Sequence, residues 1–183
     1  MSNFYLKKYN CVFIHIPKTG GMSIRRGIFK GEYEGPFLGI IPQQYKGLFK
    51  FCFVRNPYDR IISAWKYCQH YFKSTITLKE FITIVVDDNI DYTSWNTDRT
   101  FYRHHSIPQT HPFNCLHMAD FVGRFENINE DMVKICDQLN IKAELPHKNQ
   151  SKRGHYRDYF DAESRWLVDK WYKKDIETFG YVF

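Results

Sequence analysis

The chain has 183 residues, of which 43% are hydrophobic, and this content excludes an intrinsically disordered protein. The length suits one domain over residues 1–183 and is enough to bury a sizeable core. Lysine and arginine number 26 and aspartate and glutamate 20, so the net charge of +6 favours an anionic partner. Nucleic acids, phosphorylated small molecules and acidic polysaccharides all fit that charge.

The cysteine pattern and the lengths of the apolar runs indicate the cellular compartment of the protein. No run approaches the ~20 apolar residues that a membrane span needs, and the first ten residues lack the apolar stretch of a signal peptide. The five cysteines are far apart, with no C-x-x-C pair. We therefore expect reduced, mostly buried thiols in a cytoplasmic protein without membrane contact.

Three short apolar runs are predicted strands, the first two without the alternation of a half-buried strand, as in a parallel sheet covered on both faces. These runs are residues 11–16, 49–54 and 120–125. Apolar residues at helical spacing follow each of them. The predicted helices are 22–30, 57–71 and 128–139.

The remaining segments give weaker patterns. Thr77 and Glu80 form a capping box that predicts a helix over 78–86. Residues 90–117 are irregular in pattern, and 142–160 form a polar, basic loop before a last helix, which Asp161 is expected to cap. The alternation of strands and helices predicts an α/β three-layer sandwich with a mainly parallel sheet.

A glycine-containing turn, PKTGGMS, joins the first predicted strand to its helix. The first N–H groups of a helix have no partner within it and the helix dipole is positive there, so such a turn can bind an anion. The glycines allow close approach, and Lys18 adds a positive charge. The alternative is an ordinary turn with a solvated lysine. The candidate anion-binding residues are Pro17, Lys18, Thr19, Gly20, Gly21, Met22 and Ser23.

This turn differs from the phosphate-binding loop G-x-x-x-x-G-K-[ST], because its lysine precedes the glycines. No hydrophobic strand ends in an acid that would hold Mg²⁺. The nearest candidate, DFVGRFE, ends in Glu126 but contains Arg124. The pattern therefore disfavours Mg-ATP, and no metal is expected.

A second candidate site lies in FVRNPYDRIISAW, which places Arg55 at the carboxyl end of a predicted strand, where open α/β sheets bind ligands. Arg55 can form bidentate bonds to a phosphate, and Ser63 follows about two helical turns later. Structural alternatives exist for this segment. Arg55 and Arg60 could each pair with an acid, and Asp59 suits the first turn of a helix.

Together, HIPKTGGMS and FVRNPYDRIISAW resemble the paired cofactor motifs of sulfotransferases, particularly the carbohydrate sulfotransferases. The resemblance continues in DFVGRFENINED and in the C-terminal tail, so it spans most of the chain. It implies a sulfotransferase fold related to that of P-loop NTPases. It also implies transfer of a sulfuryl group from 3′-phosphoadenosine 5′-phosphosulfate (PAPS) to an acceptor hydroxyl, expected on a carbohydrate, with release of adenosine 3′,5′-bisphosphate.

The resemblance also implies roles for single residues. In the family the first motif holds the 5′-phosphosulfate, and the arginine and serine that match Arg55 and Ser63 hold the 3′-phosphate. Lys18 then lies where charge develops as the sulfuryl group leaves, and no metal takes part. A basic segment near the C-terminus closes over the 3′-phosphate in these enzymes, and a solvated basic loop is the alternative here. By position and type, the matching residues are Lys152, Arg153 and Gly154.

The acceptor hydroxyl must lose a proton as it attacks, and a histidine or carboxylate usually takes it. The stretch YRHHSIPQ resembles an H-x-x-P-Q segment of Golgi carbohydrate sulfotransferases, which aligns His105, Pro108 and Gln109. This implies His105 as the base, with His104 next, and packing or surface histidines are the alternative. We expect His15 to be a core histidine. Aromatic residues of 90–103 are either core or the lining of an acceptor cleft.

Three other functions stay open. An ATP-dependent kinase conflicts with the position of the lysine and the missing acid. A nucleic-acid-binding module would need a basic stripe with stacking rings, and no known module signature occurs, so nucleic acid is a disfavoured partner. A non-catalytic member of the fold would bind the nucleotide without turnover.

Overall fold

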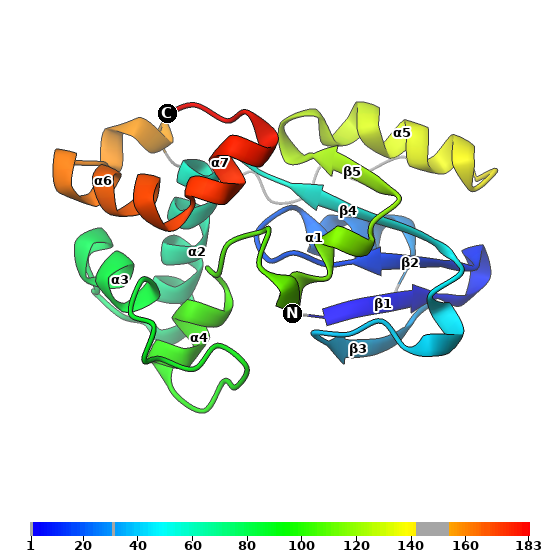
Figure 1. The fold of residues 1–183 in the computed structure, drawn as a ribbon, viewed down its shortest axis with the longest axis horizontal. Helices are drawn as coiled ribbons and strands as arrows, with labels where there is room; N and C mark the ends of the chain where they lie inside the picture. Colours follow the sequence, from blue (N-terminus) through cyan, green and yellow to red (C-terminus); the bar gives the residue numbers. More distant parts are fainter. Residues whose placement is uncertain (1, 31, 142–153) are drawn as a thin grey trace. The chain divides into compact units, whose positions relative to one another are not determined.

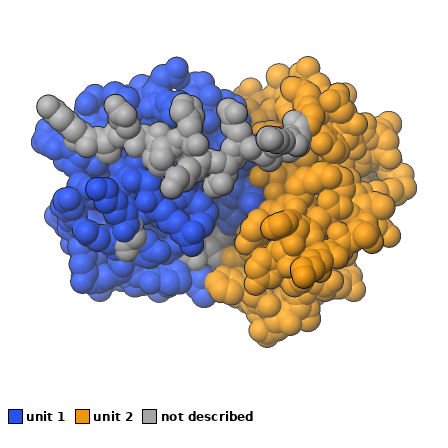
Figure 2. Space-filling model, turned by 180° about the vertical axis from the view of Figure 1, so that it is seen from behind, with its two compact units in different colours: residues 1–55, 109–152 blue, residues 56–108, 153–183 orange. Residues whose placement is uncertain are grey.

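The computed structural model describes residues 2–30, 32–141 and 154–183. The chain divides into two compact units, each made of two stretches (Figure 2). Unit 1 comprises residues 1–55 and 109–152, and unit 2 comprises residues 56–108 and 153–183. One domain over residues 1–183 stays a prediction.

Unit 1 contains a five-stranded sheet in the order β3-β1-β2-β4-β5 (Figure 1). Its strands are β1 (Ser2–Leu6), β2 (Cys11–Ile14), β3 (Glu34–Leu38), β4 (Phe49–Val54) and β5 (Phe121–Arg124). The pairs β2–β4 and β4–β5 are parallel, whereas β1 pairs antiparallel with both β2 and β3. The α/β class is confirmed, with the three predicted strands forming the parallel part.

The antiparallel strands β1 and β3 are additions that the sequence pattern did not indicate. In β1, Phe4 and Leu6 are buried, but the strand is only five residues long. Strand β3 is mostly exposed and contains Pro36, which a strand at the edge of a sheet tolerates because one side of it needs no ladder bond. Neither strand has the strongly apolar run by which β2 and β4 were found.

Helices of unit 1 contribute side chains to a core that also includes β1, β2 and β4. The predicted helix 22–30 begins as α1 (Gly21–Ser23) and continues as η2 (Ile24–Ile28), a wider π turn. The predicted helix after β5 is α5 (Ile128–Gln138). The short helices are η1 (Lys7–Tyr9), η3 (Gln43–Tyr45), η4 (Pro112–Asn114), η5 (Leu116–Met118) and η6 (Phe125–Asn127). The core contains Phe4, Phe13, Ile24, Ile28, Phe51, Phe53, Met132 and Ile135, among others.

Unit 2 is helical in its described residues. Its helices are α2 (Pro57–Phe72), α3 (Leu78–Val85), α4 (Asp98–His104), α6 (Ala162–Trp171), α7 (Lys173–Phe179) and the short η7 (Tyr156–Tyr159). The structure confirms α2, α3 and α6 near their predicted bounds, whereas α4 lies in the segment predicted to be irregular. Its capping box pairs Thr97 with Thr100 in place of the usual glutamate or glutamine, so the pattern did not mark it.

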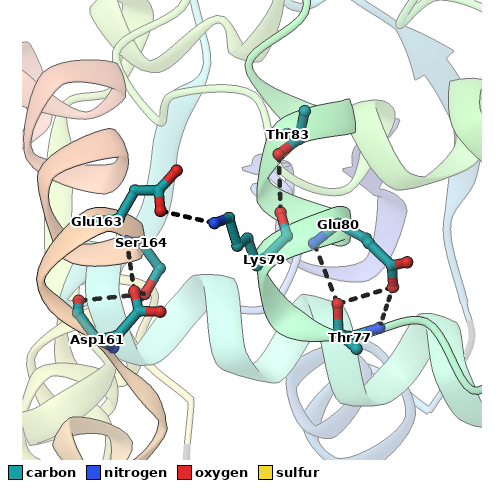
Figure 3. Close-up of polar contacts among 7 residues, drawn as sticks. All are labelled: Thr77, Lys79, Glu80, Thr83, Asp161, Glu163 and Ser164. Atoms are coloured by element: carbon teal, nitrogen blue, oxygen red, sulfur yellow. Dashed lines mark hydrogen bonds and ion pairs between the residues drawn. The ribbon is translucent and has the colours of Figure 1, made fainter.

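The predicted caps of α3 and α6 are present (Figure 3). The Thr77 hydroxyl accepts from the Glu80 N–H, and Glu80 Oε2 accepts from the Thr77 N–H over 2.8 Å. Asp161 Oδ1 accepts from the Ser164 N–H over 2.7 Å. The Lys79–Glu163 ion pair between the two helices has both side chains more than half exposed, so it contributes little to stability.

All five cysteines are buried thiols outside any disulfide, as expected from their spacing. Burial raises the pKa of the Cys11 and Cys52 thiols to about 12, which keeps both protonated at neutral pH. Within the described ranges, no helix combines the length and the apolar character needed to cross a bilayer.

Candidate functional site

The turn after β2 is a closed loop in unit 1. Strand β2 is buried throughout, and Ile16 and Thr19 beyond it are fully buried. The Thr19 hydroxyl donates to the Ile16 carbonyl oxygen over 2.8 Å. Thr19, one of the candidate anion-binding residues, therefore uses its hydroxyl proton to close the loop in this structure.

Both glycines of the loop are required by its geometry. Gly20 has φ +87°, in the left-handed region, and a Cβ there would lie 2.7 Å from Ile128 Cδ1. A Cβ on Gly21 would lie 2.1 Å from His15 Cδ2. His15 thus packs against the first residue of α1, as well as near the rings of Phe4 and Phe13. The glycine pair of the sequence motif allows this close packing.

The loop leads directly into α1. The N–H groups of Ser23 and Ile24 donate to the Gly20 carbonyl oxygen over 3.0 and 3.3 Å, which begins the helix. Ser23 is half-buried, while Met22 is 39% exposed and its sulfur accepts from Arg25 Nη2. Pro17 is buried at the start of the loop.

The two sequence motifs meet at Arg55, which follows β4. Arg55 is 7% exposed, and its Nη1 donates to the Lys18 carbonyl oxygen over 3.0 Å. Its guanidinium carbon lies 4.0 Å from the centroid of the Phe125 ring, a cation–π arrangement. The structure therefore brings together Lys18 and Arg55, which are 37 residues apart in sequence. Two cationic residues at the carboxyl ends of neighbouring parallel strands form a candidate anion site.

Gln109 is a buried neighbour of this site to which the sequence assigned no role. Its Oε1 accepts from the Arg55 N–H over 2.8 Å, and its Nε2 donates to the Arg55 carbonyl oxygen over 2.9 Å. Gln109 is fully buried. The one signal in the sequence was its place in the H-x-x-P-Q resemblance.

Ser63 lies on α2 in unit 2 and is half-buried. The helix begins as predicted, with Pro57 in its first turn and the Asn56 side chain accepting from the Tyr58 N–H over 3.0 Å. Arg60 is 1% exposed, and its Nη2 donates to the Ile107 carbonyl oxygen over 2.6 Å. Arg60 is thus part of the packing of unit 2.

The two candidate bases lie in different environments within unit 2. His104 is 3% exposed, and its Nδ1 lies 2.7 Å from the Tyr92 carbonyl oxygen. Burial lowers the pKa of His104 to about 4, so this ring is neutral at pH 7. His105 is half-buried, and its Nδ1 lies 2.9 Å from the Phe101 carbonyl oxygen. Since a carbonyl can only accept, Nδ1 carries the proton in both rings and Nε2 is the basic nitrogen.

The remaining predicted residues are placed as follows. Lys152 and Arg153 lie outside the described residues, and Gly154 is exposed. Of the aromatic candidates for an acceptor cleft, Phe101 and Tyr102 belong to the core of unit 2, whereas Trp95 is 49% exposed. In the described part of the chain, no three His, Cys, Asp or Glu side chains form a group that could hold a metal ion.

The fold is that of an α/β protein whose candidate anion-binding loop follows the carboxyl end of the parallel strand β2. A family model described as "Sulfotransferase family" matches residues 31–182, so the chain belongs to the sulfotransferase family. The matched stretch contains Arg55, Ser63 and His105, while the loop 17–23 precedes it.

Two individual relatives are similar to parts of the chain. An uncharacterised protein of Archaeoglobus fulgidus is 25% identical over 115 residues, which is 62% of this chain and 86% of the relative. A sulfotransferase from Alicyclobacillus acidocaldarius, of known crystal structure, is similar with a TM-score of 0.42 and 17% identity. That match covers 75% of this chain and 60% of the other.

Proposed function

We propose that this protein transfers a sulfuryl group from PAPS to a hydroxyl group of a saccharide. The observation that carries the proposal is the hydrogen bond from Arg55 to the Lys18 carbonyl oxygen, which joins the two motifs in unit 1. A donor with anionic groups at both ends needs two separate cationic contacts in one site. The net charge of +6 favours an anionic ligand in general, and this donor is one.

Each cation has a distinct role in this proposal. The loop 17–23, with Lys18, takes the 5′-phosphosulfate, and Arg55 with Ser63 takes the 3′-phosphate. The buried Arg55 guanidinium is held in place by Phe125 and the Lys18 carbonyl oxygen, so little of its freedom is lost on binding. Lys152, Arg153 and Gly154 are proposed to cover the 3′-phosphate.

The transfer is an in-line displacement at sulfur. The acceptor oxygen forms a bond to sulfur while the bond from sulfur to the bridging oxygen of the 5′-phosphate breaks, and adenosine 3′,5′-bisphosphate leaves. Lys18 stabilises the negative charge that develops on the leaving phosphate. Positioning of the two reactants supplies much of the remaining rate.

The proton of the acceptor hydroxyl passes to His105 in this mechanism. Its Nδ1 proton is engaged by the Phe101 carbonyl oxygen, which supports Nε2 as the site that accepts a proton. His104 has the same tautomer, but its burial and its pKa of about 4 make it a weaker base. The observations therefore favour His105 over His104.

A thermal-shift comparison of adenosine 3′,5′-bisphosphate, AMP and Mg-ATP tests the donor. A ligand at about 100 times its Kd adds about 2.7 kcal/mol to the stability of the protein. At roughly 2–4 °C per kcal/mol for a chain of this size, the expected rise in Tm is about 5–10 °C. We expect this rise with the bisphosphate and a much smaller one with the other two nucleotides.

The outcomes separate the competing functions. A rise with Mg-ATP alone would support the kinase alternative, and no rise with any nucleotide would overturn PAPS as the donor. The acceptor is tested by incubating the protein with PAPS and a panel of neutral and acidic oligosaccharides, lipids and tyrosine peptides. Release of the bisphosphate that depends on an oligosaccharide is expected. Release that depends only on a lipid or peptide would exclude the saccharide class.

A further inference from the structure

We infer that Gln109 is a positioning residue that holds the Arg55 backbone and so orients the Arg55 guanidinium to bind the 3′-phosphate of the donor. The inference rests on the proposed function, because it concerns how Arg55 binds that phosphate. It adds a residue that neither sequence motif contains.

The first step is the pairing between the Gln109 amide and the Arg55 backbone. The Gln109 side chain accepts from the Arg55 N–H and donates to the Arg55 carbonyl oxygen, over 2.8 and 2.9 Å. A primary amide offers the same donor and acceptor as a peptide group. Gln109 thus bonds Arg55 as a neighbouring strand would.

The second step is where this pairing occurs. The register of β4 with β2 ends at Cys52, and its register with β5 ends at Val54. Arg55 is the next residue, so its backbone lies one position beyond the last strand pair of the sheet. The amide of Gln109 extends the hydrogen-bonded backbone by this one residue.

The third step concerns the direction of the Arg55 side chain. Fixing the backbone N–H and C=O fixes the direction in which the side chain leaves the chain. Arg55 is then held at three places, which are its backbone, the Phe125 ring and the Lys18 carbonyl oxygen. Gln109 is itself held in place, since its backbone carbonyl oxygen accepts from Asn114 Nδ2 over 3.2 Å. A buried cation with such fixed geometry can select a phosphate at one position of a nucleotide.

The test compares Gln109→Met, Gln109→Glu and Arg55→Ala with the wild type by measuring the Kd of adenosine 3′,5′-bisphosphate and of AMP. Methionine is close to glutamine in size and removes both bonds, whereas glutamate keeps the acceptor and loses the donor. Gln43→Met, at an exposed position of η3 in the same unit, is the control. Melting temperatures of every variant show that it is folded.

We expect Gln109→Met to raise the Kd of the bisphosphate about tenfold, which corresponds to about 1.4 kcal/mol. The Kd of AMP should stay within about twofold of the wild-type value. Gln109→Glu should weaken binding of the bisphosphate at least as much as Gln109→Met, because an ionised carboxylate cannot donate to the Arg55 carbonyl oxygen and adds a negative charge beside the residue that binds the phosphate. In the Arg55→Ala background, Gln109→Met should cause no further loss, because a positioning residue acts through the residue it holds. A purely structural role would instead weaken both nucleotides equally in either background.

The possible failures are distinguishable. If the wild type prefers the bisphosphate and Gln109→Met keeps that preference, the inference is wrong while the proposed function stands. If the wild type binds the bisphosphate no better than AMP, Arg55 does not read a 3′-phosphate, and the proposed donor and this inference both fail.

Discussion

The Lys18 carbonyl oxygen accepts a hydrogen bond from Arg55 Nη1 over 3.0 Å. Lys18 has φ +68°, in the left-handed region that non-glycine residues seldom adopt. The backbone of Lys18 therefore takes part in the framework that joins the two motifs. A substitution can remove the Lys18 side chain without removing this backbone bond. The catalytic role of the ammonium group can therefore be tested separately from the structural role of the backbone.

Replacing Lys18 by alanine should lower kcat far more than it weakens donor binding. The ammonium group stabilises charge that develops mainly in the transition state, and losing such a contact costs about 10²–10³ in kcat. Steady-state kinetics with PAPS and direct binding of adenosine 3′,5′-bisphosphate measure the two effects. Lys8→Ala, at an exposed position in η1, is the matched control. Equal losses in turnover and binding would remove Lys18 from a transition-state role.

Gly21→Ala should destabilise the protein through a clash with His15, and His15→Ala should relieve it. A Cβ at Gly21 would lie 2.1 Å from His15 Cδ2, and such overpacking costs about 1–3 kcal/mol. Urea unfolding of the two single variants and the double variant gives the coupling energy. Gly47→Ala is the control, because a Cβ there meets nothing within 4 Å. If the effects of the two single variants simply add in the double variant, contact with His15 is not the reason that position 21 requires glycine.

The parts of the fold that could be predicted are those with a local signal. Strands β2 and β4 were found because all their residues except Lys50 are apolar, and α3 because Thr77 and Glu80 form a regular capping box. Strand β3 was missed because its residues are mostly exposed, and its role depends on pairing with β1. Helix α4 was missed because its cap uses Thr100. Elements stabilised by distant partners leave little trace in a local pattern.

The same distinction applies to the candidate site. Lys18 and Arg55 were predicted as cationic site residues from their places after apolar strands, and in the structure Arg55 Nη1 donates to the Lys18 carbonyl oxygen. The pairing of Gln109 with Arg55 joins residues 54 apart through a side-chain amide, and no spacing rule marks such a contact. His104 and His105 are adjacent in sequence, so only their burial in the fold separates their properties.

His104 should make the protein less stable as the pH falls below 6.5. Burial lowers its pKa from 6.5 to about 4, so between these values the unfolded chain binds a proton that the folded chain does not. The free energy of unfolding then falls with decreasing pH, by up to about 3 kcal/mol at pH 4. Urea unfolding from pH 7 to 4.5 measures this dependence. His104→Asn should reduce the slope, while His117→Asn, at an exposed position, should not. If the free energy of unfolding of His104→Asn depends on pH as strongly as that of the wild type, His104 is not the group that causes the dependence.

His105→Asn should lower kcat by about 10²–10⁴ while leaving the Kd of adenosine 3′,5′-bisphosphate unchanged, because general-base catalysis contributes about this factor. The Nδ1 proton is held by the Phe101 carbonyl oxygen, so the variant loses the basic Nε2 and can keep a donor near that carbonyl. Initial rates of bisphosphate release at saturating PAPS measure the effect. His104→Asn should lower kcat much less, since His104 is 3% exposed and too weak a base. If His105→Asn keeps wild-type turnover and His104→Asn does not, the buried histidine is the base and the order of the two candidates is reversed.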